Sequence, residues 1–527
     1  MSNIEQFKEE VTQGYTFKGD SFIVGGGMID KSAISGLQVK IPLKTLNRHG
    51  LIAGATGTGK TKSIQLISEQ LSDKGISVLM MDIKGDFSGI AEAGVENQIV
   101  KDRVNLIGNS WNATGFPVEL MTISNQDGVR LRSTTLEFGP ILISKILELN
   151  DTQQSVMSIV FKFADENKLP LVDLKDLKKT LQFMAGDGKA EVEQEYGSIS
   201  PATLGTITRK IVELEQQGAE LFFGEPSFQV NDLLRKDENG KGFVNIIRLT
   251  DIQDKPKLFS TFMLSLLAEV YSTFPERGDA DQPELVIFID EAHLVFDSAS
   301  KTLLDQIETI IKLIRSKGVG IFFCTQNPND IPAGVLSQLG LKVQHALRAF
   351  TAKDRQAIKL VAQNYPLTDY YVVDEVITQL GIGEAFISAL NEKGIPTPLV
   401  HTLMAPPQSR MDILTDEEMR ANIQKSQLYL KYKENLDRDS AYEILSNRME
   451  AVSQEVAEKN IKKPAEEESI TSKIFGKVSQ QIFNTATREL AKSATKGISN
   501  KMMKGVANTA TREVSRGLLG AIMKAFK

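Results

Sequence analysis

The fold of this chain is decided by the stretch Gly50-Leu-Ile-Ala-Gly-Ala-Thr-Gly-Thr-Gly-Lys-Thr61. It fits the phosphate-binding pattern G-x-x-x-x-G-K-S/T, whose fixed positions fall on Gly54, Gly59, Lys60 and Thr61. A short apolar run precedes the motif and a helix-like stretch follows it, which is the context that the motif requires. The sequence therefore predicts an α/β protein with a mostly parallel sheet between helices.

The loop itself is predicted to bind phosphate. Its glycines let the backbone curl so that several N–H groups face one anion, and the following helix adds the positive end of its dipole. Lys60 would neutralise charge on the β and γ phosphates of ATP, and the Thr61 hydroxyl would bind Mg²⁺. A glycine turn with a chance lysine is the structural alternative. The predicted nucleotide-binding residues are Gly54, Ala55, Thr56, Gly57, Thr58, Gly59, Lys60 and Thr61.

Further along the chain, buried strands are predicted to deliver polar groups to one edge of the sheet. In parallel sheets the carboxyl ends of the strands are where ligands bind. The charges that follow the first of these strands are explained about as well by a solvated loop. The polar groups are Asp82-Ile83-Lys84-Gly85-Asp86, Asp290 with Glu291, and Gln326, at the ends of the apolar runs 76–83, 284–291 and 319–326.

The two carboxylates and the glutamine suit nucleotide hydrolysis. Burying unpaired carboxylates is costly, so a partner is implied, and we predict Mg²⁺ and a water molecule. Asp290 would hold the Mg²⁺ shell, Glu291 would act as the general base, and Gln326 would sense the γ-phosphate or orient the water. A helix cap remains the alternative for the carboxylates, and a structural role for Gln326.

The chain divides by pattern into four parts. Residues 1–45 are predicted to form a short β lead-in around a turn at Gly25-Gly26-Gly27, and residues 46–405 the nucleotide-binding core. Helical periodicity predicts an insertion in that core over residues 136–234. Beyond it, residues 406–470 are predicted to form a charged helical arm and residues 471–527 a basic amphipathic tail in which residues 484–490 recur as 508–514.

Composition narrows the class of protein. With 527 residues, 41% of them apolar, the chain is long enough for a large core, and its single cysteine, Cys324, excludes a disulfide framework. No apolar run reaches membrane-spanning length, so we expect a cytoplasmic protein. The tail holds eleven Lys and Arg against two Glu, a net charge of +9, and the overall charge of −6 leaves −15 for residues 1–470.

Several of these motifs resemble those of the HerA-like ATPases of the HerA/FtsK superfamily. The resemblance covers roughly residues 20–405 and is closest to a bacterial subgroup of the family. The matching stretches are residues 47–61, Asp290-Glu291-Ala292-His293, Cys324-Thr325-Gln326-Asn327-Pro328 and, for the subgroup, residues 82–86 and 149–153.

The resemblance implies a RecA-like core, a hexameric ring with ATP and Mg²⁺ at subunit interfaces, and ATP-driven movement on double-stranded DNA. It also implies an arginine supplied by a neighbouring subunit, for which Arg48, Arg315 and Arg348 are the candidates and the last two are preferred. The 45 residues before the core are shorter than the β-barrel of DNA-processing members, which bears on ring contacts and on the docking of a partner nuclease or other effector protein.

Two functions of different class remain open. The first is a hexameric motor that translocates on, or unwinds, double-stranded DNA. The second is an ATPase that remodels or assembles proteins at a membrane surface, with residues 471–527 as an amphipathic anchor. Lysines and arginines interleaved with apolar residues suit both anionic lipid and DNA phosphate, and a solvated oligomerisation segment is a third interpretation of the tail.

Overall fold

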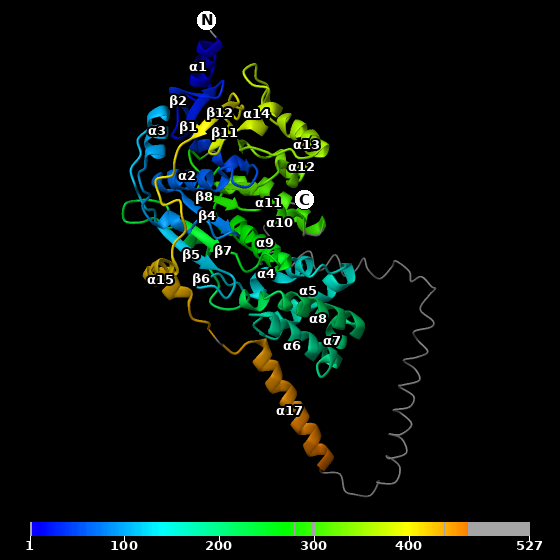
Figure 1. Ribbon diagram of the computed structural model, residues 1–527. Coiled ribbons are helices and arrows are strands. Elements are labelled where there is room, and N and C mark those ends of the chain that lie inside the picture. The colour runs from blue at the N-terminus through cyan, green and yellow to red at the C-terminus, as the bar shows by residue number, and fades with distance from the viewer. Residues whose placement is uncertain (1–2, 279, 298–300, 437, 462–527) are drawn as a thin grey trace.

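The computed structural model describes residues 3–461 apart from residue 279, residues 298–300 and residue 437 (Figure 1). These residues form a 12-stranded sheet in the order β2-β1-β12-β11-β10-β3-β9-β8-β4-β7-β5-β6. The strands are β1 (Ser21–Ile29), β2 (Ser32–Pro42), β3 (Gly50–Ala53), β4 (Ser77–Asp82), β5 (Val118–Thr122), β6 (Val129–Arg130), β7 (Val244–Arg248), β8 (Leu285–Ile289), β9 (Val319–Thr325), β10 (Leu341–Gln344), β11 (Glu384–Ser388) and β12 (Val400–Met404).

The larger part of the sheet is parallel. Every neighbouring pair from β10 through β3, β9, β8, β4, β7 and β5 to β6 is parallel, whereas β11, β12, β1 and β2 extend the sheet in antiparallel pairs. This arrangement confirms the predicted α/β fold with a mostly parallel sheet. Its parallel strands all present their carboxyl ends at one edge.

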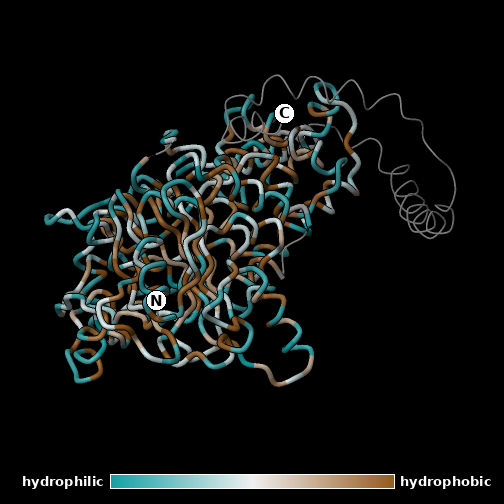
Figure 2. The backbone as a smooth tube through the Cα atoms, turned by 90° about the horizontal axis from the view of Figure 1, so that it is seen from above, coloured by the Kyte–Doolittle hydropathy of each residue, from teal (hydrophilic) through white to brown (hydrophobic). Residues whose placement is uncertain are grey.

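The central strands are buried on both faces. In β4, Leu79 and Met81 belong to one apolar cluster while Val78 and Met80 belong to another, because successive side chains point to opposite faces. Figure 2 shows these hydrophobic strands side by side in the interior. The core helices are α2 (Lys60–Asp73), α3 (Gln98–Ile107), α9 (Pro256–Thr273), α10 (His293–Asp297), α11 (Lys301–Ile314), α12 (Ala333–Leu336), α13 (Ala352–Ala362) and α14 (Val373–Gln379).

Along the chain, a group of helices follows β6 and precedes β7. In space it lies at the end of the molecule opposite α1 (Asn3–Gly14) (Figure 1). Their apolar side chains join the cluster on one face of the sheet, so they extend the core rather than forming a separate one. The group comprises α4 (Thr135–Ile146), α5 (Asp151–Glu166), α6 (Leu174–Ala185), α7 (Lys189–Tyr196) and α8 (Pro201–Gln216), within the predicted helical insertion.

The expected turn at residues 25–27 is wrong. These glycines lie inside β1, where Gly25, Gly26 and Gly27 pair with Met404, Leu403 and Thr402 of β12. A Cβ on Gly25 would lie 2.2 Å from the carbonyl oxygen of Leu403, so glycine allows the close approach of the two strands. The predicted β lead-in also begins with a helix, α1, whose Phe7 is fully buried.

After β12 the chain passes over helix α2 before it reaches its last described helices. Residues 406–414, here called the strap, run past helix α2, and Glu69 of α2 accepts hydrogen bonds from the backbone N–H groups of Gln408 (2.7 Å) and Ser409 (3.1 Å). The helices that follow, within the range predicted as a charged helical arm, are α15 (Asp416–Lys425), α16 (Gln427–Tyr432) and α17 (Ala441–Ile461). The predicted basic tail, residues 471–527, lies outside the described residues.

Candidate active site

Four neighbouring strands bring the predicted nucleotide-binding groups together. In sheet order these are β3, β9, β8 and β4, with Ala53 beside Thr325, Ile289 beside Phe323, and Met81 beside Ile289. The residues that follow the strand ends therefore share one edge. They are the phosphate loop after β3, Gln326 after β9, Asp290 and Glu291 after β8, and residues 82–86 at the end of β4.

The phosphate loop has the backbone of an anion cradle. Gly54, Gly57 and Gly59 have φ values of 153°, 77° and 112°, which side-chain-bearing residues rarely adopt. Gly59 caps the amino end of α2, so the positive end of the helix dipole faces the loop. The Lys60 ammonium is turned onto the loop and donates to the carbonyls of Gly54 and Ala55, and burial lowers its pKa.

A buried histidine packs against this loop. His345 follows β10, and a Cβ on Gly54 would lie 2.5 Å from its Cβ atom. Its Nε2 is 2.9 Å from the Ser63 hydroxyl and its Nδ1 is 2.8 Å from the Glu384 carbonyl oxygen. Burial lowers its pKa to about 4, so the ring is neutral at physiological pH. The sequence offered no motif that singled out this residue.

The two carboxylates after β8 are both buried. Glu291 has a φ of 47°, an unusual value for a residue with a side chain and one that is often found at functional sites. Burial raises the pKa of Asp290 to about 7; Glu291 and Asp82 add to the rise, and Lys84 opposes it. Neither Glu291 oxygen has a hydrogen bond of ordinary geometry, but Oε1 forms an ion pair with the Lys84 ammonium and Oε2 lies 3.1 Å from His293 Nδ1.

Residues 82–86 form part of the same site. The Asp82 carboxylate accepts hydrogen bonds from the N–H groups of Gly85 (2.7 Å) and Asp86 (3.2 Å), which shapes the loop. The Thr61 hydroxyl donates to Asp86 at 3.2 Å, and Lys84 reaches Glu291. These contacts favour the interpretation that residues 82–86 contribute to the ligand-binding edge of the sheet over the alternative of a solvated loop.

The donor set fits Mg²⁺ together with a nucleotide. Within the described residues, no group of three or more His, Cys, Asp or Glu side chains is arranged to hold a metal ion. Mg²⁺ normally takes one or two protein ligands and completes its shell with phosphate oxygens and water. The Thr61 hydroxyl and the buried Asp290 carboxylate meet that requirement, because each is an oxygen donor beside the phosphate loop.

Of the remaining predicted residues, some lie at this edge and some do not. Gln326 is exposed and lies between the phosphate loop and Glu291 in strand order. Arg348 follows the carboxyl end of β10, is exposed, and donates to the Thr378 carbonyl at 3.2 Å. Arg48 and Arg315 precede β3 and β9, so they lie at the opposite edge of the sheet.

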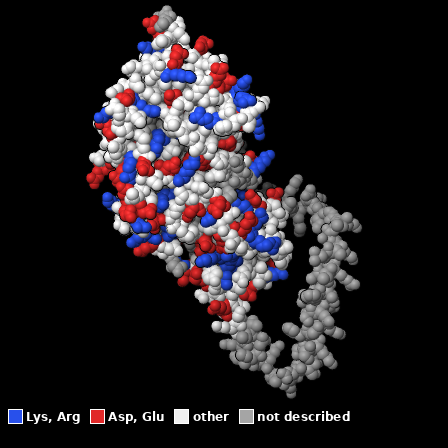
Figure 3. All heavy atoms as spheres, viewed as in Figure 1, with Lys and Arg blue, Asp and Glu red and all other residues white. Residues whose placement is uncertain are grey.

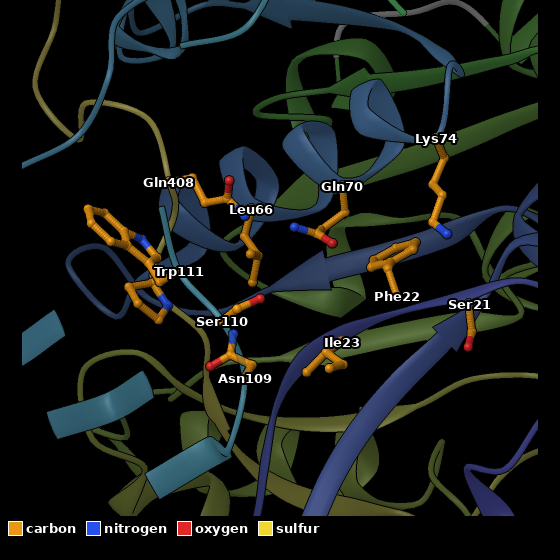
Figure 4. A pocket seen from close by; sticks show the side chains of 11 residues that line it. Ser21, Phe22, Ile23, Leu66, Gln70, Lys74, Asn109, Ser110, Trp111 and Gln408 are labelled. Carbon is orange, nitrogen blue, oxygen red and sulfur yellow. The ribbon is translucent and has the colours of Figure 1, made fainter. Parts of the chain in front are cut away.

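A separate pocket of about 280 Å³ lies between helix α2, strand β1 and the strap (Figure 4). Leu66 and Gln70 line it from α2, Lys74 lines it from just after that helix, and Phe22 lines it from β1. Trp111, the single tryptophan of the chain, completes one side and donates its indole N–H to the Pro407 carbonyl at 2.8 Å. No residue of the phosphate loop lines this pocket, so it is distinct from the nucleotide site.

Charge is mixed over the described surface that Figure 3 shows. Lysine and arginine side chains are interspersed with aspartate and glutamate, and no broad area of this face carries one sign. Binding to a DNA backbone depends on clustered cations. A DNA contact would therefore use a narrower group of basic side chains or another face.

Comparison with known proteins gives one family and one fold. The family model for the Helicase HerA-like C-terminal family matches residues 29–527. The DNA double-strand break repair helicases HerA of Sulfurisphaera tokodaii and Sulfolobus acidocaldarius are 24% and 20% identical, each aligned over 69% of this chain and 67% of the relative. The unbound bacterial conjugative coupling protein TrwBdeltaN70 has the same fold, with a TM-score of 0.50, 13% identity, and coverage of 77% of this chain and 94% of that one.

Within the described part of the chain, no helix has the length and apolar character needed to cross a lipid bilayer.

Proposed function

The chain belongs to the Helicase HerA-like C-terminal family of P-loop ATPases, and from this premise we propose that it is a ring-forming motor that hydrolyses ATP to translocate on, or unwind, double-stranded DNA. The observation that carries the hydrolytic part is the convergence of four strand ends on one edge. The phosphate loop, Gln326, the Asp290–Glu291 pair and Lys84 come from neighbouring strands. The choice of DNA as the substrate rests on the named relatives, which are DNA repair helicases.

Each residue has a distinct task in the proposed reaction. The loop N–H groups and Lys60 would bind the triphosphate, exchanging the present contacts of Lys60 with loop carbonyls for phosphate oxygens. Thr61 and Asp290 would hold Mg²⁺, which when bound screens the charge of the β and γ phosphates. Glu291 would accept the proton of the attacking water, and Gln326 would orient that water.

We further propose that a neighbouring subunit completes the site. A catalytic arginine stabilises the charge that develops on the phosphoryl group. Arg348 is the preferred residue because it lies at the same sheet edge as the loop and is exposed. Arg315 and Arg48 lie at the opposite edge and could act only if a neighbouring subunit presented that edge to the loop.

A second function rests on residues 471–527 alone. The net charge of +9 and the apolar residues interleaved with it suit an anionic membrane surface, where the chain would remodel or assemble proteins. Truncation at residue 470 separates the two proposals. If the chain is a DNA motor, the truncated protein either keeps its DNA-stimulated hydrolysis or loses that stimulation together with its affinity for DNA. If it is a membrane-bound remodelling ATPase, truncation removes only the stimulation by anionic vesicles.

The central experiment is ATP hydrolysis with and without duplex DNA at several salt concentrations. We expect several-fold stimulation by DNA that falls as salt rises, because phosphate contacts are electrostatic. Glu291→Gln should bind ATP and turn over at least about a hundredfold more slowly, and Lys60→Ala should lose nucleotide binding. Stimulation by anionic vesicles but not by DNA would contradict the motor, and unchanged turnover in Glu291→Gln would refute the assigned base.

A further inference from the structure

The proposed base is not free to accept a proton in this structure. Both oxygens of Glu291 are buried, and both are engaged by cations or rings, Oε1 by the Lys84 ammonium and Oε2 by His293. Each oxygen has acceptor capacity left beside its one contact, but both atoms are buried, so an attacking water has no open approach to either of them in this structure. One of these contacts must break before Glu291 can act.

Lys84 is the mobile partner of the two. It sits on the loop after β4, its side chain is 37% exposed, and it reaches across the end of β8 to Glu291. His293 instead begins helix α10, two residues after Glu291, and its side chain is shorter than that of Lys84, which leaves the ring less reach away from Glu291. The contact with Lys84 is therefore the one that can be exchanged without moving a strand or helix.

Lys84 also belongs to the charge cluster that surrounds the phosphate loop. Lys60 and Lys84 are close enough for each ammonium to be influenced by Asp290 and Glu291, and Lys84 adds to the lowering of the Lys60 pKa. Asp86, on the same loop as Lys84, accepts a hydrogen bond from Thr61 of the phosphate loop. The 82–86 loop is thus tied to both the base and the nucleotide-binding loop.

We propose that Lys84 is a γ-phosphate ligand that rests on Glu291 until a nucleoside triphosphate arrives. The γ-phosphate offers the ammonium a stronger anion than the carboxylate, and the transfer of Lys84 frees Glu291 Oε1 for the attacking water. A nucleoside diphosphate lacks that group and leaves Lys84 on Glu291. Lys84 therefore distinguishes triphosphate from diphosphate and couples that distinction to the base. This inference rests on the proposed ATP-binding function.

The test is the affinity of Mg²⁺ complexes of a non-hydrolysable ATP analogue and of ADP, measured by titration calorimetry on the full chain. Lys84→Met should weaken the analogue roughly tenfold, the value of one charge-assisted hydrogen bond, and change ADP by less than about twofold. Lys84→Arg keeps the charge and should retain the preference for triphosphate. Lys393→Met, an exposed lysine on the turn after β11, is the matched control and should change neither affinity.

A double-mutant cycle tests the resting contact itself. Glu291→Gln removes the charge that holds Lys84, so the affinity of this variant for the analogue should rise several-fold while its affinity for ADP stays unchanged. Adding Lys84→Met should abolish that rise, because the released lysine is no longer present. Lys84→Gln provides a second uncharged variant should Lys84→Met fail to fold, with Trp111 fluorescence as the check on folding.

The outcomes separate this inference from the proposed function. Equal weakening of analogue and ADP, or no change in either, would overturn the role of Lys84 while ATP binding stands. Additive effects in the cycle would overturn the resting contact with Glu291. If the wild-type chain binds neither nucleotide, as is expected only of Lys60→Ala, the proposed function and this inference are overturned together.

Discussion

Replacement of Glu69 by Gln should remove a pH dependence of folding stability that arises where the strap crosses helix α2. Glu69 is fully buried and accepts hydrogen bonds from the N–H groups of Gln408 and Ser409 and from the Ser409 hydroxyl. Burial raises its pKa from 4.5 to about 7 and outweighs these donors, which lower it. In the folded chain Glu69 therefore keeps its proton to near neutral pH.

The sign and size of the effect follow from the difference in pKa. Between pH 4.5 and pH 7 the folded state holds a proton that the unfolded state has released, so the free energy of unfolding falls as pH rises and is level above that window. The full difference corresponds to roughly 3 kcal/mol. Glutamine cannot ionise, so Glu69→Gln should gain roughly 2 to 3 kcal/mol relative to the wild type between about pH 5 and about pH 8.

Urea unfolding of both proteins at these two pH values, followed by Trp111 fluorescence, measures the effect. Trp111 donates to the Pro407 carbonyl and so reports on the strap directly. Other buried carboxylates titrate equally in both proteins and cancel in the comparison. Glu417→Gln, at an exposed position on α15, is the control and should parallel the wild type. A constant difference between Glu69→Gln and wild type at both pH values would show that the donors keep Glu69 ionised and refute the reasoning.

Three further predictions concern the loop, the sheet and the neighbouring subunit. Gly54→Ala should weaken ATP binding about tenfold by calorimetry, because φ of 153° costs a side chain about 1–3 kcal/mol and the new Cβ meets His345; unchanged affinity would contradict the cradle. Gly25→Val should lower the free energy of unfolding by about 2 kcal/mol or more in urea, because its Cβ cannot fit between β1 and β12. Arg348→Ala should bind ATP but turn over about a thousandfold more slowly. Mixing it with Glu291→Gln should restore measurable turnover if Arg348 acts on a neighbour, and a mixture as inactive as its parts would place Arg348 outside the site.

The fold could be predicted where strands are buried on both faces. Such strands are continuous apolar runs, and the runs ending in Asp290, Gln326 and Asp82 are β8, β9 and β4 of the sheet. The glycines at residues 25–27 could not be placed in a strand, because local pattern favours a turn and only the partner strand β12, far along the chain, explains them. The strap was missed for the same reason, since its partner Glu69 lies more than three hundred residues earlier.

The site could be predicted in its parts but not in its internal contacts. Spacing alone identified the phosphate loop and the carboxylates, because the motif encodes the local backbone. It did not reveal that Lys84 pairs with Glu291 or that His345 supports Gly54, since both contacts join residues from different strand ends. The roles of Gln326 and Arg348 stay predictions that rest on their positions.

The balance of charge at the loop argues for a cation from outside the subunit. Within one chain, Lys60 and Lys84 are both influenced by two buried carboxylates, Asp290 and Glu291, and those two ammonium groups are already engaged by loop carbonyls and by Glu291. A bound triphosphate brings more negative charge than one Mg²⁺ neutralises, and charge grows on the transferring group during hydrolysis. Moving Lys84 onto the γ-phosphate offsets part of this excess but leaves the buried acids less compensated. We therefore expect a further positive group at the exposed side of the edge, and in the proposed ring a neighbouring subunit would present it there as an arginine such as Arg348.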